Sequence, residues 1–355
     1  LISILFAGLI TALSVLAIAD LPKVSVPSGA SPWLQGESTR RFESHYDQNF
    51  PVRQLGINVW AAVEYLLFRE GRRGLVIGEQ DWLYTNEEFQ AHAGGERLLE
   101  QHLAEIAEVH DRLAVQGTTL IVALVPAKAR VYPEFIREQR PAAIHHELYA
   151  HARRSLIGKG VPAPDLLTAM EQCKRIAPVF LRTDTHWTPW GADCAASAIG
   201  DTVRRLTLQT PQPSAYRTEI EAPENYRGDL LGFLPLEPTF SRLLPKPDEL
   251  QPRVTRALET QNLLAETPEP AVVVIGTSYS ENARWNFVGG LQQTLAEDVL
   301  NLGESGRGPF APMRDYLRSL QPGASAPRLL VWEIPERYLP APETPPPAAR
   351  PAHEA

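Results

Sequence analysis

Residues 271–285 read AVVVIGTSYSENARW. A short continuous apolar run such as AVVVIG is typical of a parallel strand that is buried on both faces. The Gly-Thr-Ser that follows lies between this strand and a predicted helix over 282–296. A serine at such a turn exposes its hydroxyl where backbone N–H groups and a helix N-terminus converge. Ser278 is therefore a candidate nucleophile, although serine also caps helices very commonly.

Four more segments have the character of buried strands, and helical patterns separate most of them. The predicted strands are 118–126, 177–181, 298–303 and 328–334, and the other predicted helices are 95–116, 143–157, 165–175, 190–206 and 310–320. Strands that alternate with helices indicate a parallel sheet with helices on both faces. The sequence therefore predicts an α/β fold with a mostly parallel five-stranded sheet. Its site is expected beyond the carboxyl ends of the strands.

The segment FLRTDTHWTP, 180–189, also leaves a predicted strand and enters a helix, with Thr188 as cap and Pro189 as first helical residue. Asp184 and His186 thus fall at the same edge of the sheet as Ser278. A serine hydroxyl needs a base, and a carboxylate on the far ring nitrogen orients that base. A metal bound by this acid and histidine is the alternative. It would require further ligands, and no His, Asp or Glu cluster adjoins them in sequence.

Composition narrows the class of protein. The chain has 355 residues, a net charge of −8 and 44% hydrophobic residues, which is enough for a large core. No long basic run is present, so we expect no nucleic-acid partner. Cys173 and Cys194 have no further Cys or His at ligand spacing, which argues against a metal site. They form either a disulfide or two buried free thiols, and we favour the free thiols.

The N-terminal stretch LISILFAGLITALSVLAIA, residues 1–19, carries no charge and is long enough to span a bilayer. It also ends in Ala-Ile-Ala, which resembles a signal-peptidase site. We therefore expect either a membrane anchor or a cleaved signal, and a domain that works in the periplasm. The remaining expected parts are a linker over 20–40, one domain over 41–339 with a hairpin in 74–89 and a long insertion over 207–265, and a disordered Pro-rich tail over 340–355.

Six motifs together resemble one family, the alginate O-acetyltransferases of the AlgJ and AlgX kind. They are VIGEQDWLYTNEE, LVPAKARVYPE, TDTHWTPWGA, NYRGDLLGFLPL, GTSYSENARWNF and WEIPERYL. These proteins are similar to SGNH hydrolases, so the resemblance implies a three-layer α/β/α fold. It covers roughly residues 40–340. The Asp-x-His motif precedes the serine here, whereas it follows the serine in ordinary SGNH hydrolases.

The resemblance implies Ser278 as nucleophile, His186 as base and Asp184 as the acid that orients it. Ser278 would accept an acetyl group as an ester, and a sugar hydroxyl would then take that group. The backbone N–H of Ser278 would bind the oxyanion, with a second donor expected from the Gly228–Asp229 turn.

Three more side chains were considered for a substrate that is anionic or rich in hydroxyls: Lys128, Tyr279 and Arg307. For each of them a surface or structural role is an equal alternative. The resemblance implies no cofactor. It implies an exopolysaccharide acceptor, other exopolysaccharide assembly proteins, and an acetyl donor supplied by a multi-pass membrane acyltransferase.

Two other functions fit the same residues. An acetylesterase would use the same triad with water as the acceptor. A non-catalytic scaffold subunit of a polysaccharide export complex is the alternative outside enzymes, but a scaffold has no need of Asp184, His186 and Ser278 together.

Overall fold

The computed structural model describes residues 53–136, 143–206, 214–258, 271–320 and 326–343, with a few isolated positions elsewhere. The chain forms two compact units. The smaller one combines Leu1–Arg72 with Gly232–Leu244, and the larger one combines Arg73–Leu231 with Pro245–Ala355. The expected anchor or signal, the linker and the Pro-rich tail lie largely outside the described residues. Among the helices that are described, none has the length and apolar character needed to cross a membrane.

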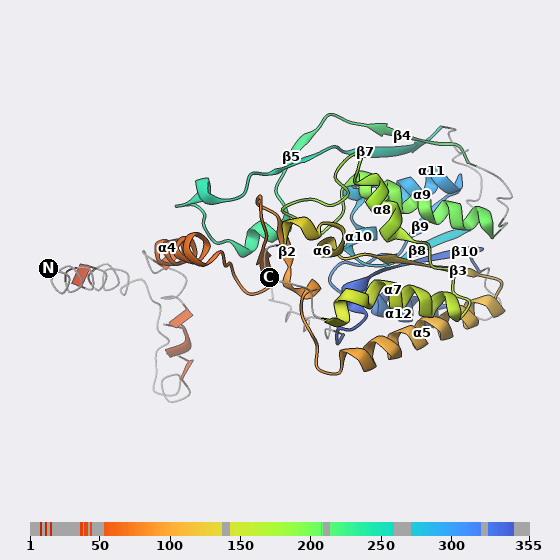
Figure 1. Cartoon of the computed structure of the whole chain (residues 1–355), viewed down its shortest axis with the longest axis horizontal. Helices are drawn as coiled ribbons and strands as arrows, with labels where there is room; N and C mark the ends of the chain where they lie inside the picture. The colour runs from red at the N-terminus through yellow and green to blue at the C-terminus, as the bar shows by residue number, and fades with distance from the viewer. Residues whose placement is uncertain are drawn as a thin grey trace. The chain divides into compact units, whose positions relative to one another are not determined.

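A four-stranded parallel sheet forms the centre of the larger unit (Figure 1). In spatial order its strands are β3 (Thr119–Val125), β10 (Leu329–Pro335), β8 (Val272–Ile275) and β9 (Val299–Asn301). In this register Trp332 of β10 lies opposite Val122 on one side and Ile275 on the other. Because all four strands are parallel, their carboxyl ends lie at one edge, where the site was expected.

The predicted strand over 177–181 does not join this sheet, so the prediction of five strands was wrong by one. Its only ladder-like contact is an isolated antiparallel bridge between Phe180 and Trp187. The segment is nevertheless buried, and its backbone bonds elsewhere: Val179 N–H donates to the Tyr132 hydroxyl, and Val179 O accepts from Thr188 N–H. An apolar run therefore indicated burial here, but not strand pairing.

Helices cover both faces of the sheet, which confirms the three-layer α/β/α prediction (Figure 1). One face carries α5 (Gly95–Val115), α7 (Ala143–Gly158) and α12 (Phe310–Ser319), and the other carries α8 (Leu166–Cys173), α9 (Pro189–Arg205) and α11 (Phe287–Leu295). Alternate side chains of each strand enter opposite cores. In β3, for example, Val122 faces the first group of helices and Ile121 the second.

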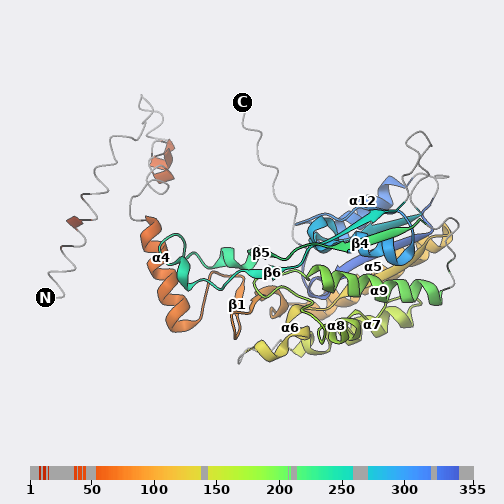
Figure 2. The ribbon, with the colours of Figure 1, turned by 90° about the horizontal axis from the view of Figure 1, so that it is seen from above.

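Short strands and short helices lie outside the central sheet and its covering helices. The hairpin predicted in 74–89 is present as β1 (Leu75–Ile77) and β2 (Leu83–Thr85). The insertion forms two antiparallel pairs, and Figure 2 shows one of them as β5 beside β6. These strands are β4 (Tyr216–Ile220) with β7 (Arg253–Ala257), and β5 (Glu224–Tyr226) with β6 (Asp248–Leu250). The short helices are α6 (Lys128–Val131), α10 (Ser278–Glu281), η3 (Asn86–Glu88), η4 (Pro133–Phe135), η5 (Asp229–Phe233), η6 (Ser241–Leu243), η7 (Ala283–Trp285) and η8 (Glu336–Tyr338).

Cys173 and Cys194 form a disulfide, so the preference for free thiols was wrong. The bond joins the end of α8 to the first half of α9. These two helices pack closely enough that the two Cα atoms lie 6.6 Å apart, within the range that a disulfide spans. The sequence could not show this distance, because it arises from the packing of the two helices.

The start of α9 depends on a close backbone approach, and this gives a stability prediction. A Cβ on Gly191 would lie 2.1 Å from the carbonyl oxygen of Val179, so Gly191→Ala must displace backbone. We expect the free energy of unfolding to fall by about 2–3 kcal/mol. Gly158→Ala is the matched control, because a Cβ there meets nothing within 4 Å. The control should change stability by less than about 1 kcal/mol. Urea unfolding of both variants tests this, and equal stabilities would contradict it.

Candidate active site

The candidate nucleophile lies where strand β8 turns into α10. Thr277 is the N-cap of this short helix, and its Oγ1 accepts the N–H of Tyr279. Ser278 follows as the first helical residue and remains partly exposed, whereas Tyr279 and Ser280 are buried. The predicted strand, turn and serine are therefore all present at the expected edge of the sheet.

A buried carboxylate from the neighbouring strand holds this turn. Glu333 of β10 is completely buried and accepts hydrogen bonds from Thr277 N–H (2.7 Å) and the Ser280 hydroxyl (3.0 Å). Gly276 makes room for it, since a Cβ there would lie 2.4 Å from Glu333 Oε2. Burial raises the pKa of Glu333 above its usual value, although these hydrogen bonds oppose the shift. Glu333 therefore holds the backbone of Thr277 before Ser278 and the side chain of Ser280 after it.

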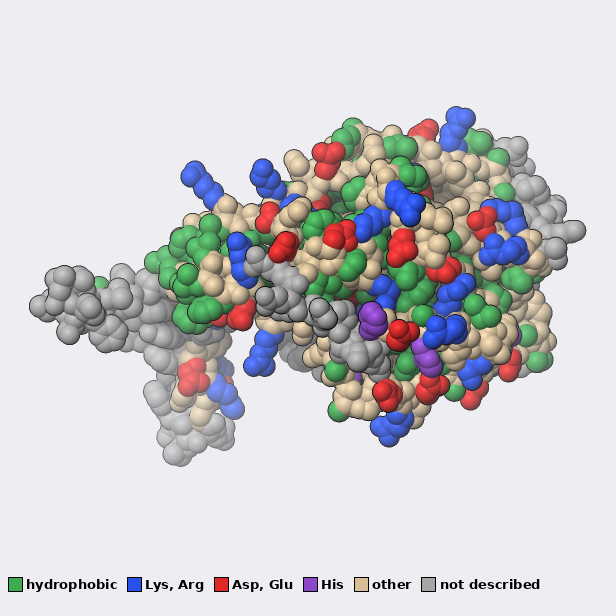
Figure 3. Space-filling model, viewed as in Figure 1, with side chains coloured by type: hydrophobic (Ala, Val, Ile, Leu, Met, Phe, Trp, Pro, Cys, Tyr) green, Lys and Arg blue, Asp and Glu red, His purple; other side chains and the backbone are tan. Residues whose placement is uncertain are grey.

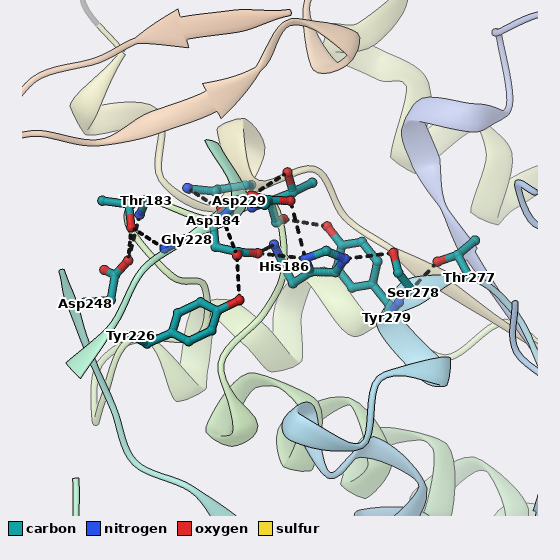
Figure 4. A network of polar contacts seen from close by, with 12 residues as sticks. Thr183, Asp184, His186, Tyr226, Gly228, Asp229, Asp248, Thr277, Ser278 and Tyr279 are labelled. Atoms are coloured by element: carbon teal, nitrogen blue, oxygen red, sulfur yellow. Dashed lines mark hydrogen bonds and ion pairs between the residues drawn. The ribbon is translucent and has the colours of Figure 1, made fainter. Parts of the chain in front are cut away.

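His186 connects the serine to an acid (Figure 4). Its Nε2 lies 2.7 Å from Ser278 Oγ, and its Nδ1 lies 2.7 Å from Asp184 Oδ1. If Nδ1 carries the proton and donates it to Asp184, Nε2 is free to accept the serine proton. The structure thus brings together Ser278, His186 and Asp184, which the sequence had placed at one edge from two distant segments.

The Asp184 carboxylate is fully buried, and several donors surround it. Oδ1 also accepts His186 N–H (2.9 Å), while Oδ2 accepts the Tyr226 hydroxyl (2.9 Å) and Asp229 N–H (2.8 Å). Burial by itself would raise the pKa of Asp184. The hydrogen bond and charge of His186, with the backbone N–H groups, outweigh burial and bring the pKa below its usual value. The acid is therefore held in its charged form.

A second carboxylate, Asp229, lies beside the same imidazole. Its Oδ2 is 3.8 Å from His186 Nδ1, and its Oδ1 accepts Thr185 N–H at 2.8 Å. Burial, and then the negative charge of Asp184, raise the pKa of Asp229. Asp184, His186 and Asp229 offer ligand atoms within 4.8 Å of one another, so a metal has to be considered. The atoms of Asp184 and His186 already hydrogen-bond within the triad, and this arrangement fits proton transfer better than metal ligation.

Aromatic rings enclose the imidazole. The ring of Trp285, in η7, stacks on His186 with centroids 5.2 Å apart and planes at 21°, and Tyr279 lies on it at 4.8 Å. Trp285, Tyr226 and Glu333 were not among the site residues predicted from the sequence. Two signals were available, because Trp285 closes the GTSYSENARW segment and Glu333 interrupts the apolar run LLVWEIP.

Lys128, one of the side chains considered for substrate binding, is buried under the site. Its Nζ donates to the carbonyl oxygens of Leu83 (2.5 Å), Arg182 (2.9 Å) and Asp184 (2.9 Å). Burial lowers the pKa of Lys128 to about 8, although nearby carboxylates oppose the shift. The ammonium group therefore ties the hairpin to the acid-bearing segment and does not reach a substrate.

The N–H groups of the Gly228–Asp229 turn, from which an oxyanion donor is expected, have acceptors within the chain. Gly228 N–H donates to Thr183 Oγ1 at 3.3 Å, and Asp229 N–H donates to Asp184. Gly228 approaches so closely that a Cβ would lie 2.1 Å from Thr183 O. Both N–H groups of the turn therefore hydrogen-bond to the segment that carries Asp184.

Tyr279 and Arg307, the other two side chains considered for substrate binding, also contact residues of the chain itself. The Tyr279 hydroxyl is buried, donates to Thr185 O at 2.7 Å and accepts from Arg337. Arg307 forms ion pairs with Glu304 (2.7 Å) and Asp315 (2.8 Å). Tyr279 therefore links the nucleophile helix to the histidine segment.

Lys128→Met should act on stability and not on substrate affinity. The change removes three hydrogen bonds from the Lys128 ammonium group to main-chain carbonyl oxygens, so we expect the free energy of unfolding to fall by about 3 kcal/mol or more. Lys246→Met, at an exposed position, is the control and should have little effect. Chemical unfolding and steady-state kinetics test the pair. A stable Lys128→Met protein with a raised KM would instead return Lys128 to the substrate site.

Glu333→Gln should change how stability depends on pH. Because the pKa of Glu333 is raised above 4.5 in the folded state, the native protein keeps a proton that the unfolded chain loses. Wild-type stability therefore falls as pH rises from 4.5 to the folded pKa, with a slope of up to about 1.4 kcal/mol per pH unit. Glutamine cannot ionise, so the variant gains relative stability across that window.

Urea unfolding at several pH values measures this difference. Glu171→Gln, on an exposed face, should follow the wild-type curve. A difference between Glu333→Gln and wild type that stays constant with pH would show that the carboxyl pKa is not raised.

Comparison with known proteins agrees with this fold. The family model described as the SGNH hydrolase-like domain of the acetyltransferase AlgX matches residues 75–336. A probable alginate O-acetylase AlgJ from Pseudomonas putida is 48% identical over 312 residues, covering 86% of this chain and 81% of that protein. The probable alginate O-acetylase AlgJ of Azotobacter vinelandii is 44% identical over 340 residues, covering 94% and 87%.

Solved structures give the same result. The O-acetyltransferase domain of Pseudomonas putida AlgJ superimposes with a TM-score of 0.71 at 46% identity, covering 77% of this chain and 94% of that domain. AlgX of Pseudomonas aeruginosa superimposes with a TM-score of 0.57 at 21% identity, covering 80% and 66%, which is a likeness of fold. The chain belongs to the family of SGNH hydrolase-like acetyltransferases that contains AlgJ and AlgX.

Proposed function

We propose that this protein acetylates hydroxyl groups of an exopolysaccharide, alginate in the first instance, through an ester on Ser278. One observation carries the proposal: Ser278 Oγ, His186 and Asp184 form an unbroken chain with both links at 2.7 Å. The relatives named alginate O-acetylase support the choice of polymer.

In the first half-reaction Ser278 takes the acetyl group. His186 Nε2 accepts the serine proton while Oγ attacks the acetyl carbonyl carbon. As the tetrahedral intermediate collapses, the bond to the donor's leaving group breaks and His186 returns the proton to that group. Asp184 stabilises the imidazolium that exists between these steps.

In the second half-reaction a sugar hydroxyl replaces the donor. His186 accepts its proton, the hydroxyl oxygen attacks the ester carbonyl, and the bond to Ser278 breaks as His186 returns the proton to Oγ. The Ser278 N–H is the donor we assign to the oxyanion in both halves. An acetylesterase would run the same steps with water as the acceptor.

We place this chemistry in the periplasm, on a chain tethered to or exported across the inner membrane. The uncharged segment over 1–19 supports export. The Cys173–Cys194 disulfide supports an oxidising compartment. We further propose that a multi-pass membrane acyltransferase supplies the acetyl groups, and that the protein works with other exopolysaccharide assembly proteins.

The decisive experiment gives the full chain a chromogenic acetyl ester, with and without oligomannuronate. Ser278→Ala should lower chromophore release at least about a thousandfold, and Asp184→Asn by a comparable factor. Ser319→Ala, on the exposed end of α12, is the matched control and should be fully active. Mass spectrometry should find an acetyl group on Ser278 and on the sugar.

Each outcome separates the candidate functions. Acetylated sugar that disappears in Ser278→Ala establishes the transferase and the nucleophile together. Serine-dependent release that never acetylates sugar would favour the esterase. Release that does not depend on Ser278 would overturn the proposal.

A further inference from the structure

The smaller unit presents an apolar helical face to solvent. This face is formed by α4 (Arg53–Val63) and the π-helical turn η2 (Glu64–Phe68) that continues it. Its exposed side chains are Leu55 (47%), Val59 (44%), Trp60 (62%), Leu66 (54%), Leu67 (72%) and Phe68 (61%). They are six of the fourteen exposed large hydrophobic residues in the described part of the chain, within one short stretch. In Figure 3 hydrophobic side chains gather over α4.

The opposite side of the same helix is fixed within its unit. Asn58 is fully buried, and its Nδ2 donates to the carbonyl oxygens of Pro235 (2.6 Å) and Glu237 (2.7 Å). Ala62 and Tyr65 are buried as well. These contacts hold the apolar face outward. A helix on the surface of a water-soluble protein would carry polar side chains there, and contiguous exposed apolar surface marks an interaction site.

The charges around this face have the pattern of a helix at a membrane interface. Between residues 54 and 68 the one charged residue is Glu64, and its carboxylate accepts the Trp60 indole N–H at 2.7 Å. Arg53 begins the helix, and the exposed Arg69 and Arg72 follow it. Residues 53–72 thus carry three arginines against two glutamates, a net +1 in a chain whose net charge is −8.

We propose that this face, Leu55 to Phe68, lies in the headgroup region of an anionic bilayer. Interfacial helices bury Trp, Phe and Leu at the headgroup–acyl boundary while arginines meet lipid phosphates. The uncharged segment over 1–19 would bring the same chain to a bilayer. Charge complementarity favours an anionic lipid, because arginines lie at both ends of this exposed apolar stretch in a chain that is acidic as a whole.

A fluorescent reporter at residue 67 tests this contact on the full chain. The native cysteines are joined in a disulfide, so Leu67→Cys adds one free thiol that an environment-sensitive dye labels selectively. Val115→Cys, at the end of α5 and 90% exposed, is the matched control. Each labelled protein is mixed with vesicles of phosphatidylglycerol and phosphatidylcholine that carry a lipid-bound quencher near the headgroup.

We expect the quencher to remove most of the emission from residue 67 and to leave that from residue 115 unchanged. Arg69→Glu with Arg72→Glu should weaken quenching at residue 67, and pure phosphatidylcholine should do the same. Equal emission at both positions, or no association with vesicles, would overturn the proposal. A change in emission at residue 67 that occurs only when another membrane protein is added would also overturn the proposal, because it would indicate a protein partner. The assay does not measure acetyl transfer, so its result is independent of the proposed function.

Discussion

The architecture of the site follows from one buried charge, the carboxylate of Asp184. A carboxylate with no exposed surface is tolerated only when donors replace the water that it loses. Those donors come from separate parts of the chain: His186 from the same turn, Tyr226 from β5 and Asp229 from η5. The insertion between α9 and β8 is therefore part of the candidate site, because it supplies both donors that Asp184 Oδ2 accepts from.

The segment around Ser278 and the segment with Asp184 and His186 are held by different contacts. Few hydrogen bonds join the two segments. Glu333 of β10 fixes the turn around Ser278, whereas Lys128 and the insertion fix the segment with Asp184. Between the two segments lie the bond from His186 to Ser278 and the bond from the Tyr279 hydroxyl to Thr185 O. Tyr279, which is buried, thus joins the helix that begins at Ser278 to the residue before His186.

Local patterns in the sequence predicted much of this arrangement. Features that depend on pairing between distant segments could not be predicted. The turn at Ser278 and the cap before α9 could be read because each is encoded by neighbouring residues. The contact between Glu333 and the turn at Ser278 could not be predicted, because it depends on β10 lying beside β8. The sequence of either strand alone does not give the order of strands in the sheet. The segment over 177–181 failed for a related reason: its apolar residues encode burial, but the bonds of its backbone depend on Tyr132 and Thr188.

Two buried acids near the serine show how the fold places its charge. Glu333 and Asp184 are both completely buried, yet the pKa of the first is raised and that of the second is lowered. Both accept several hydrogen bonds, so the number of donors does not separate them. The difference is the direct bond between Asp184 and a ring that becomes a cation. In the proposed mechanism an ionised Asp184 stabilises the imidazolium of His186. The two pKa values therefore shift in opposite directions because, of these two acids, only Asp184 hydrogen-bonds directly to a basic side chain.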